Sequence, residues 1–342
     1  MTTPEKPPEH LVWLSMMFKG VSVTTALALG AVYGVWAYYV FDKLFKTHGV
    51  MLWSFLAGVP LVIGLLVSHF AYRRQTAGVA GSGTMAMVAT FLCIFSAGAF
   101  LREGTICIVM ALPIFVVFTA IGSAIGLYVS KRKGKNGDTL MSLALLSPVI
   151  FGAAEDIVVS PVLLVLTHRE IQIAAPKADV WRHINYPSNI KPEELAGGFA
   201  YMIGVPYPIE AKTLDERNGG HRELVWERGV SFEEIITDWQ PEKRIAWTYA
   251  FGPNSFPPGS LDDHIVIGGR YFDLLSTAYT LTPQTDGSTL LAIDVETRVS
   301  TTFNWYAGLW AQYLVDDTAK AILQFYKQRS ERQSGGPAQT AN

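Results

Sequence analysis

The stretch IQIAAPKADVWRHI, residues 171–184, changes character at its proline. Before Pro176, apolar and polar residues alternate as they do in a half-buried strand. After it, Val180, Trp181 and Ile184 lie on one side of a short helix. A water-soluble strand and helix therefore begin in the middle of a chain whose preceding residues are mostly apolar. The chain has two halves of different character, and this stretch opens the second.

Charge is distributed unevenly along the 342 residues. The chain is 50% hydrophobic and 16% charged, against about 25% charged for a typical soluble domain. Long runs between Val21 and Ala154 carry no charge, whereas charges recur every few residues from His168 onward. The formal net charge of −2 provides no basic footprint, so no nucleic-acid partner is expected. Cys93 and Cys107 both lie in apolar runs, which excludes a disulfide framework in the polar half.

Five apolar runs in the first half predict membrane helices. A helical crossing needs about 17–25 residues; the first four runs are long enough, but the fifth would reach only about 22 Å. The runs are Val21–Phe41, Val50–Tyr72, Thr84–Leu101, Thr105–Ser130 and Leu140–Ala154. We expect an N-terminal α-helical membrane bundle of about five spans over residues 21–154, preceded by a cytoplasmic segment, 1–20.

Lysine and arginine in the short loops predict the orientation of these helices. If the N-terminus is inside, the inner segments hold eight of these residues and the outer loops three. The inner set is Lys6, Lys19, Arg73, Arg74, Lys131, Arg132, Lys133 and Lys135, and the outer set is Lys43, Lys46 and Arg102. We therefore expect an integral protein of the cell or inner membrane with a cytoplasmic N-terminus. The C-terminal half is extracytoplasmic if Leu140–Ala154 crosses, which is the favoured arrangement, and cytoplasmic if that run does not cross.

Two of the spans carry glycines four residues apart, Gly30 with Gly34 and Gly122 with Gly126. This spacing lets helix backbones approach closely. Packing within the bundle is the favoured interpretation, and a homo-oligomer formed through the membrane helices is the alternative. The spans hold no charge at mid-depth, which disfavours a transporter with a proton or ion pathway.

The second half has the pattern of an α+β domain over residues 168–331, after a linker at 155–167 and before a disordered tail at 332–342. Lys177–Asn185 is predicted to be a short helix, and Pro192 suits the first position of another. Turn signals then separate about six strands, as in an antiparallel meander. The predicted strands are Ile209–Leu214, Arg222–Glu227, Phe232–Trp239, Arg244–Phe251, Tyr271–Leu281 and Thr289–Ser300.

A long helix over residues 304–329 is expected to close the domain. Its predicted apolar stripe consists of Tyr306, Trp310, Tyr313, Leu314, Ala321 and Phe325. A strongly curved antiparallel sheet wrapped around one long helix leaves space between the two. Such a cavity is the natural place for a ligand.

Three motifs in this half carry a resemblance. The opening stretch resembles an entry strand followed by an Ala-Pro-x-x-x-Val-Trp turn and helix; FEEIITDWQPEKRIAWTY (232–249) resembles a recurring strand pair. GSTLLAIDVETRV (287–299), ahead of WYAGLWAQYLVDDTAKAILQFYKQRSE (305–331), resembles a last strand and its gripping helix. Together they resemble the START-like, polyketide cyclase/dehydrase (SRPBCC) superfamily over roughly residues 168–331. The membrane half resembles no family.

The resemblance implies a helix-grip fold around a cavity for lipids, sterols, polyketides or other hydrophobic molecules. Members of the superfamily include binders, carriers, cyclases and coenzyme-free modifying domains. Because one fold hosts all of these, the resemblance leaves the activity open.

Catalytic motifs are absent from the sequence. It contains no G-x-S-x-G elbow, H-E-x-x-H helix, paired CxxC or P-loop, and we expect neither a metal nor a cofactor. The closest approach to a metal cluster, Asp262-Asp263-His264, is interpreted as a solvated loop.

Polar residues interspersed with aromatic ones are the candidates for ligand binding. They are Trp226, Glu234, Tyr249, Tyr271, Tyr279, Tyr306, Trp310, Tyr313 and Asp317. Glu234, which matches the acid of the family pattern, and Asp317, the acid on the stripe of the closing helix, are also the candidates for a catalytic acid or base. A salt bridge is the commoner role for a buried acid, and Arg222 or Arg298 is the expected partner of Glu234.

Three functions remain open. The favoured one is a membrane-anchored START-like domain that binds a hydrophobic or lipid-like small molecule between its sheet and its C-terminal helix; its partners would be that molecule and the lipid bilayer. The second is a polyketide cyclase/dehydrase-like enzyme, which is disfavoured because no nucleophile–base arrangement is present. The third is a filled-core scaffold or protein-interaction domain, favoured if the aromatic residues fill the cavity.

Overall fold

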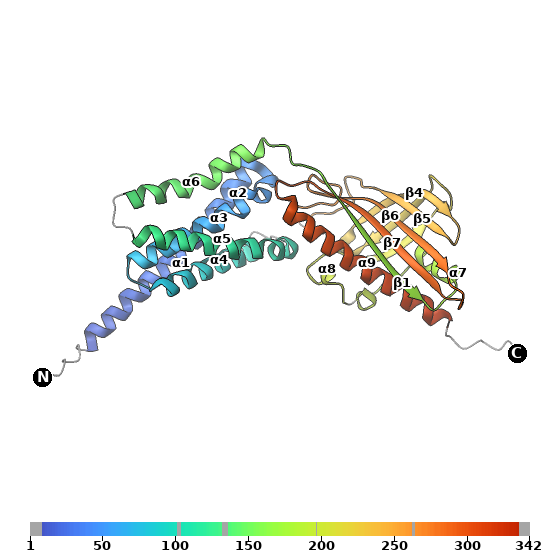
Figure 1. Ribbon diagram of the computed structural model, residues 1–342, viewed down its shortest axis with the longest axis horizontal. Coiled ribbons are helices and arrows are strands. Elements are labelled where there is room, and N and C mark those ends of the chain that lie inside the picture. The colour runs from blue at the N-terminus through green and yellow to red at the C-terminus, as the bar shows by residue number, and fades with distance from the viewer. Residues whose placement is uncertain (1–8, 101–103, 132–135, 196, 262–263, 335–342) are drawn as a thin grey trace. The chain divides into compact units, whose positions relative to one another are not determined.

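The computed structural model describes residues 9–100, 104–131, 136–195, 197–261 and 264–334. The chain forms two compact units, Met1–Val159 and Ser160–Asn342. The first unit is helical, and the second is an antiparallel sheet with a long C-terminal helix (Figure 1). This confirms the predicted fold class, a helical membrane-type region followed by a helix-grip domain.

The helical unit contains four segments that are long and apolar enough to cross a membrane. Its elements are α1 (Glu9–Phe45), η1 (Lys46–Met51), α2 (Trp53–Leu56), α3 (Gly58–Arg73), α4 (Val79–Phe100), α5 (Thr105–Lys131) and α6 (Asn136–Asp156). The four segments are Val23–Phe45, Trp53–Arg73, Val79–Ala99 and Thr105–Lys131. Each overlaps one of the first four predicted runs, with bounds that differ by up to five residues. The fifth run lies within α6, which is not among the segments found in the described residues.

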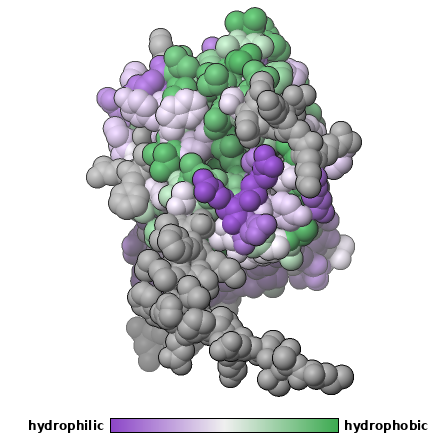
Figure 2. Space-filling model, turned by 90° about the vertical axis from the view of Figure 1, so that its left-hand side faces the viewer, coloured by the Kyte–Doolittle hydropathy of each residue, from purple (hydrophilic) through white to green (hydrophobic). Residues whose placement is uncertain are grey.

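Many apolar side chains of this unit face outward, as they do in helices that contact lipid. Phe95 on α4 is 71% exposed, and Leu143, Ile150 and Phe151 on α6 are exposed as well. Hydrophobic side chains are gathered over the upper part of the face seen in Figure 2. α1 begins at Glu9, so the segment predicted at 1–20 is helical in its second half.

The glycine pairs of the spans lie against other helices of the same unit. A Cβ added to Gly30 would meet the Ala89 Cβ at 2.8 Å, and one added to Gly122 would meet the Leu61 carbonyl oxygen at 1.9 Å. These glycines therefore permit close helix packing inside the bundle. Glu155, at the end of α6, accepts hydrogen bonds from the backbone N–H groups that begin α2, at 2.7 and 2.8 Å.

The second unit contains a seven-stranded antiparallel sheet in the order β1-β7-β6-β5-β4-β3-β2. Its strands are β1 (Leu163–Ile173), β2 (Pro208–Thr213), β3 (His221–Trp226), β4 (Ser231–Gln240), β5 (Arg244–Ala250), β6 (Phe272–Pro283) and β7 (Thr289–Val299). Its helices are α7 (Lys177–Asn185), η2 (Pro192–Leu195), α8 (Phe199–Met202), η3 (Glu227–Gly229) and α9 (Asn304–Ser334). The order of one strand, short helices, six strands and a long helix is the order predicted.

Two predicted boundaries were wrong. The linker expected at 155–167 is shorter, because α6 continues to Asp156 and β1 already begins at Leu163. The apolar residues of that segment satisfy their backbone hydrogen bonds by pairing with β7, where Leu163 lies opposite Val299. The tail expected at 332–342 is helical up to Ser334, and residues 335–342 lie outside the described residues.

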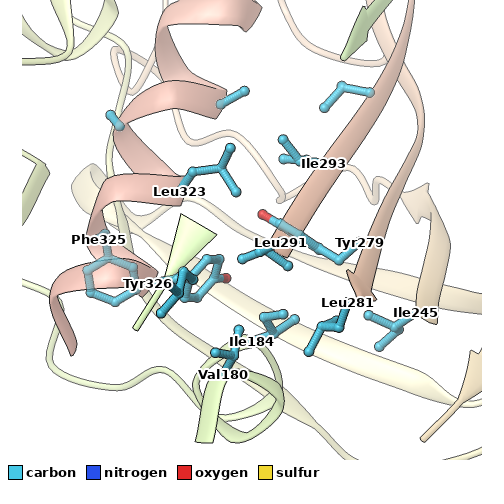
Figure 3. Close-up of a cluster of buried hydrophobic side chains, with 14 of the residues drawn as sticks. Val180, Ile184, Ile245, Tyr279, Leu281, Leu291, Ile293, Leu323, Phe325 and Tyr326 are labelled. Carbon is cyan, nitrogen blue, oxygen red and sulfur yellow. The ribbon is translucent and has the colours of Figure 1, made fainter. Parts of the chain in front are cut away.

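The core lies between one face of the sheet, here called the inner face, and the helices α7 and α9. Every second residue of β7 is buried on this face, from Thr289 to Val299. Figure 3 shows Leu323 and Tyr326 of α9 beside inner-face residues such as Tyr279 and Leu291.

The buried face of α9 differs from the predicted stripe in the first half of the helix. Ala307, Ala311 and Val315 are buried there, whereas Tyr313 is 49% exposed. The small side chains allow the helix to approach β1 closely: a Cβ on Gly308 would lie 2.6 Å from the Leu163 side chain. In the second half of the helix, Ala321 and Phe325 are buried as predicted.

Candidate functional site

A row of side chains crosses the inner face of the sheet from β2 to β5. Glu234 lies opposite Arg222 on one side and opposite Tyr249 on the other. Thr213 extends the row onto β2, opposite Arg222. Residues paired directly across antiparallel strands project from the same face, so the four side chains share the inner face. The register thereby shows that the Glu234 side chain projects from the inner face. The alternation of residues within β4 alone does not decide between the two faces.

Arg222 is fully engaged by its neighbours. Its guanidinium donates to the Glu234 carboxylate, to the Thr213 hydroxyl at 3.1 Å and to the Ile184 carbonyl at 2.8 Å. Its charge lies over the Trp247 ring, 4.2 Å from the centroid. The side chains of Arg222 and Glu234 are each 2% exposed. This satisfied and desolvated ion pair agrees with the salt bridge expected for Glu234, with Arg222 as the partner.

The network continues into α7. The Thr213 hydroxyl donates to the Asn185 side-chain oxygen at 2.8 Å, and the Asn185 amide nitrogen donates to the Trp181 carbonyl at 2.9 Å. Thus α7, the helix that follows Pro176, is joined to the far edge of the sheet through buried polar groups. Sequence reasoning missed Asn185 and Thr213, because neither residue type stands out in a strand or a short helix.

Burial governs the acid–base properties of this row. Desolvation raises the pKa of Glu234 to about 7, against the opposing effects of the Arg222 charge and the Trp247 indole. Burial also raises the pKa of Tyr249, whose hydroxyl lies 2.6 Å from that of Thr277. The row therefore contains a carboxyl group, that of Glu234, with a pKa near neutrality. This group forms an ion pair with the Arg222 guanidinium.

Beyond this row, the inner face ends in a cluster of aromatic side chains. Phe232 contacts the rings of Trp226 at 5.0 Å, Phe251 at 5.3 Å and Phe256 at 6.3 Å between centroids. Tyr249 stacks on Phe251 at 5.8 Å. Phe232 itself is buried, whereas the other four rings are only partly buried. This aromatic cluster, formed by Trp226, Phe232, Tyr249, Phe251 and Phe256, is therefore the less covered end of the inner face.

Trp226 has one further feature. Its indole nitrogen is buried, and the described part of the chain provides no hydrogen-bond acceptor for it. A buried donor without a partner calls for an explanation. An acceptor from outside the protein would satisfy it.

The remaining candidates are distributed over several places. Tyr279 is buried on the inner face, 5.5 Å from the Trp247 ring and 5.7 Å from that of Tyr326. Tyr271 is buried just before β6, with the Arg270 charge 5.6 Å from its ring centroid. Tyr279 thus belongs to the packed core, and burial raises its pKa.

The candidates on α9 form a separate group. Tyr306 and Trp310 are partly buried, and Tyr313 lies 6.1 Å from Trp310 and 5.7 Å from Phe199 between ring centroids. Asp317 accepts a hydrogen bond from the Ala200 backbone N–H at 2.8 Å, which holds the first turn of α8. Asp317 and Glu234 therefore belong to different networks.

Arg298, the alternative partner for Glu234, lies on the outer face of β7. It donates to the Gly269 carbonyl at 2.6 Å and lies 3.8 Å from the Asp273 carboxylate. Among the described residues there is no group of three potential metal ligands. Asp262 and Asp263 of the loop cluster considered above lie outside the described residues.

Comparisons with known proteins bear on the second half of the chain. No family model matches the chain, and no curated protein matches it. Solved structures do match, at low identity. A START superfamily protein from Mycobacterium smegmatis is 15% identical, with a TM-score of 0.32; the match covers 49% of this chain and 98% of that one.

Two enzymes are among the similar structures. The Zhui aromatase/cyclase from Streptomyces sp. R1128 is 16% identical, covering 52% of this chain and 99% of its own, with a TM-score of 0.32. A point mutant of norcoclaurine synthase from Thalictrum flavum, in complex with a transition-state analogue, is 12% identical, covering 51% and 98%, also with a TM-score of 0.32.

Proposed function

We propose that the C-terminal domain binds a hydrophobic or lipid-like small molecule on the inner face of its sheet, and that the N-terminal helices anchor it in a membrane. One observation carries the binding proposal: the aromatic cluster is only partly covered at one end of an otherwise packed face. Partly exposed aromatic surface at the open end of a helix-grip sheet suits an apolar ligand.

The buried indole N–H of Trp226 supports the same proposal and adds a chemical detail. A ligand that is mainly apolar but carries one acceptor, such as a carbonyl or an ester oxygen, would satisfy this donor. Among the predicted ligand-binding residues, Trp226 and Tyr249 belong to the cluster. Glu234 lies next to it, and its pairing with Arg222 gives it an organising role beneath the ligand.

Anchoring is supported by the four apolar segments and by their exposed apolar side chains. A membrane anchor raises the effective concentration of a ligand dissolved in the same bilayer. The distribution of lysine and arginine favours a cytoplasmic N-terminus, and the side on which the C-terminal domain lies follows from whether α6 crosses.

Native mass spectrometry of the full chain, released from a mild detergent after incubation with a total lipid extract, tests the proposal. We expect an adduct of a few hundred daltons. Trp226→Ala should weaken its binding by at least about tenfold, or ~1.4 kcal/mol, because it removes both aromatic area and the donor.

Val225→Ala is the matched control. Val225 is the preceding residue of the same strand, but it is exposed on the other face, so its loss should leave the adduct unchanged. If neither the parent chain nor the control retains an adduct, the binding proposal fails and the filled-core scaffold is favoured. Equal adduct retention in both variants would place the bound molecule away from the aromatic cluster.

A further inference from the structure

The edge strand β1 changes character along its length. In its first part, Leu164 and Leu166 are 54% and 71% exposed, and Val162, just before the strand, is exposed as well. After Thr167 the exposed residues are polar, as His168 and Glu170 illustrate. An exposed apolar edge strand is a hazard that soluble proteins usually cover or charge. Only the first part of β1 carries this hazard.

Helix α9 changes character in the same direction. Trp305, Leu309 and Tyr313, spaced four residues apart, are 65%, 67% and 49% exposed. This spacing places them on one side of the helix. In the second half of α9 the exposed residues are polar: Lys320, Gln324, Gln328, Arg332 and Gln333.

Contacts between β1 and α9 bring the two changes to the same level of the domain. In the apolar parts of the two elements, Gly308 of α9 lies against Leu163 of β1. Where the exposed residues change from apolar to polar, the Gln312 side chain of α9 lies 3.4 Å from the Thr167 hydroxyl of β1. In the polar parts of the two elements, Arg169 of β1 forms an ion pair with Asp316 of α9. β1 and α9 therefore share an apolar end, formed with the residue before β1 by Val162, Leu163, Leu164, Leu166, Trp305, Leu309 and Tyr313. Beyond it, the exposed residues of both elements are polar.

We propose that this apolar end rests on the surface of the lipid bilayer that holds the N-terminal helices. The proposal rests on the membrane anchoring proposed above. Residues 157–162 connect the end of α6 to the start of β1, and fully extended residues span about 3.5 Å each. The connection therefore keeps the first residues of β1 within roughly 25 Å of the last residue of α6.

The composition of the apolar end fits the interfacial layer of a bilayer. Tryptophan and tyrosine are enriched at that level because their rings are apolar at one end and polar at the other. Ile157 and Val159 of the connection are 82% and 90% exposed, so the apolar surface continues along the chain toward α6. A helix such as α9, with an apolar stripe facing outward, contacts the boundary between head groups and acyl chains.

The charged residues beside the apolar end also suit this depth. On the outer face of the sheet, Leu164 lies opposite Arg298, and Leu166 lies opposite Glu296. Arg298 has carbonyl partners and Glu296 lies 3.4 Å from the Ser276 hydroxyl. The Arg298 and Glu296 side chains are half-buried and do not project from the surface, so they do not prevent the apolar end from contacting the bilayer. As charged groups, they keep it from entering deeper than the head groups.

Site-directed spin labelling of the full chain in vesicles of phosphatidylcholine and phosphatidylglycerol tests this contact. The label is introduced by Leu309→Cys in a background of Cys93→Ala and Cys107→Ala. Oxygen concentrates in the bilayer, whereas a nickel chelate stays in water. We expect oxygen to relax the spin label at position 309, and the nickel chelate to have little effect on it.

Two matched positions make the result decisive. Gln324→Cys, on the exposed polar half of the same helix, should be reached by the nickel chelate. Phe95→Cys, on the outward face of α4, should behave like a position in contact with lipid. If Phe95→Cys fails this pattern, the membrane anchoring fails. If it holds while position 309 is reached by the nickel chelate, anchoring stands and the surface contact is overturned.

A third outcome also overturns the proposal. If both oxygen and the nickel chelate are excluded at position 309, the apolar end is covered by protein, either by the N-terminal helices or by a second copy of the chain. Leu309 is exposed and its replacement removes no core contact, so the labelled chain is expected to fold.

Discussion

Two arginine–carboxylate pairs of the C-terminal domain have the same chemistry in opposite surroundings. Arg222 and Glu234 are both 2% exposed, whereas Arg169 and Asp316 are 49% and 27% exposed. Both arginines lie on the inner face of the sheet, Arg222 on β3 where α7 covers it and Arg169 on the edge strand β1. The difference teaches that the cover over the inner face decides whether such a pair organises a core or joins two surface elements.

The largest expected effect comes from removing one partner of the buried pair. At pH 8, Arg222→Met should lower the free energy of unfolding of the domain by about 3–5 kcal/mol, because the Glu234 carboxyl group is left buried without its partner and the Thr213 and Ile184 oxygens lose their donor. Hydrogen exchange of the β4 and β5 amides in the full chain, followed against urea, measures this loss.

The control for that prediction removes both charges. Arg222→Met combined with Glu234→Leu should recover most of the lost stability, since replacing a buried ion pair by apolar residues is often close to neutral. If Arg222→Met alone costs less than about 1 kcal/mol, a value ordinary for surface pairs, the contrast between the two pairs disappears.

A second effect is expected on changing pH. Burial raises the pKa of Glu234 in the folded domain to about 7, from the ordinary 4.5 of a glutamate side chain. Between about pH 4.5 and pH 7, Glu234 is therefore protonated in the folded state but ionised in the unfolded state. The free energy of unfolding falls as the pH rises through this range. At ~1.4 kcal/mol for each pKa unit, the fall is roughly 3 kcal/mol at most.

The same hydrogen-exchange measurement across this pH range checks the prediction. The doubly substituted chain, Arg222→Met with Glu234→Leu, should lack this component of the pH dependence. An identical slope in both proteins would assign the titration to other groups.

The smallest effect is expected at the exposed pair. Asp316→Asn should cost no more than about 1 kcal/mol, and the difference should shrink as salt is added, because exposed ion pairs are weak and screened. Urea unfolding at low and high ionic strength measures it. A loss as large as that of Arg222→Met would mean that the link between β1 and α9 depends on this pair.

Much of the domain could be predicted from alternation and turn residues. The strand predicted at 232–239 is β4 (Ser231–Gln240), and that predicted at 289–300 is β7 (Thr289–Val299). Each is an amphipathic run bounded by Gly, Pro or Asn. The face of Glu234 could not be predicted in this way, because Phe232 and Ile236 favour one face of β4 while Ile235 keeps the other partly apolar. Only pairing with Arg222 and Tyr249 decides it.

The first half of α9 shows why the candidate site was only partly predictable. Large aromatic residues usually mark the buried side of a helix, and this rule selected Tyr306, Trp310 and Tyr313. Here small residues form the buried side because β1 lies so close, and a distance between two elements distant in sequence is not encoded in the local pattern. The partly covered aromatic cluster likewise includes Phe251 and Phe256, at the end of a strand and in a loop, where periodicity carries no signal.

The position of β1 has a consequence for the order in which the domain is made. Its partner is β7: Ile173 pairs with Thr289, and Leu163 with Val299. At about 5–20 residues per second, synthesis of β7 follows that of β1 by a time on the order of ten seconds. During that time the first strand has no neighbour in the sheet, and the residues that it buries in the folded domain, such as Val165 and Ile173, have no place to pack. The domain closes only when its last strand arrives, so a chain that stops short of β7 leaves an apolar strand unpaired.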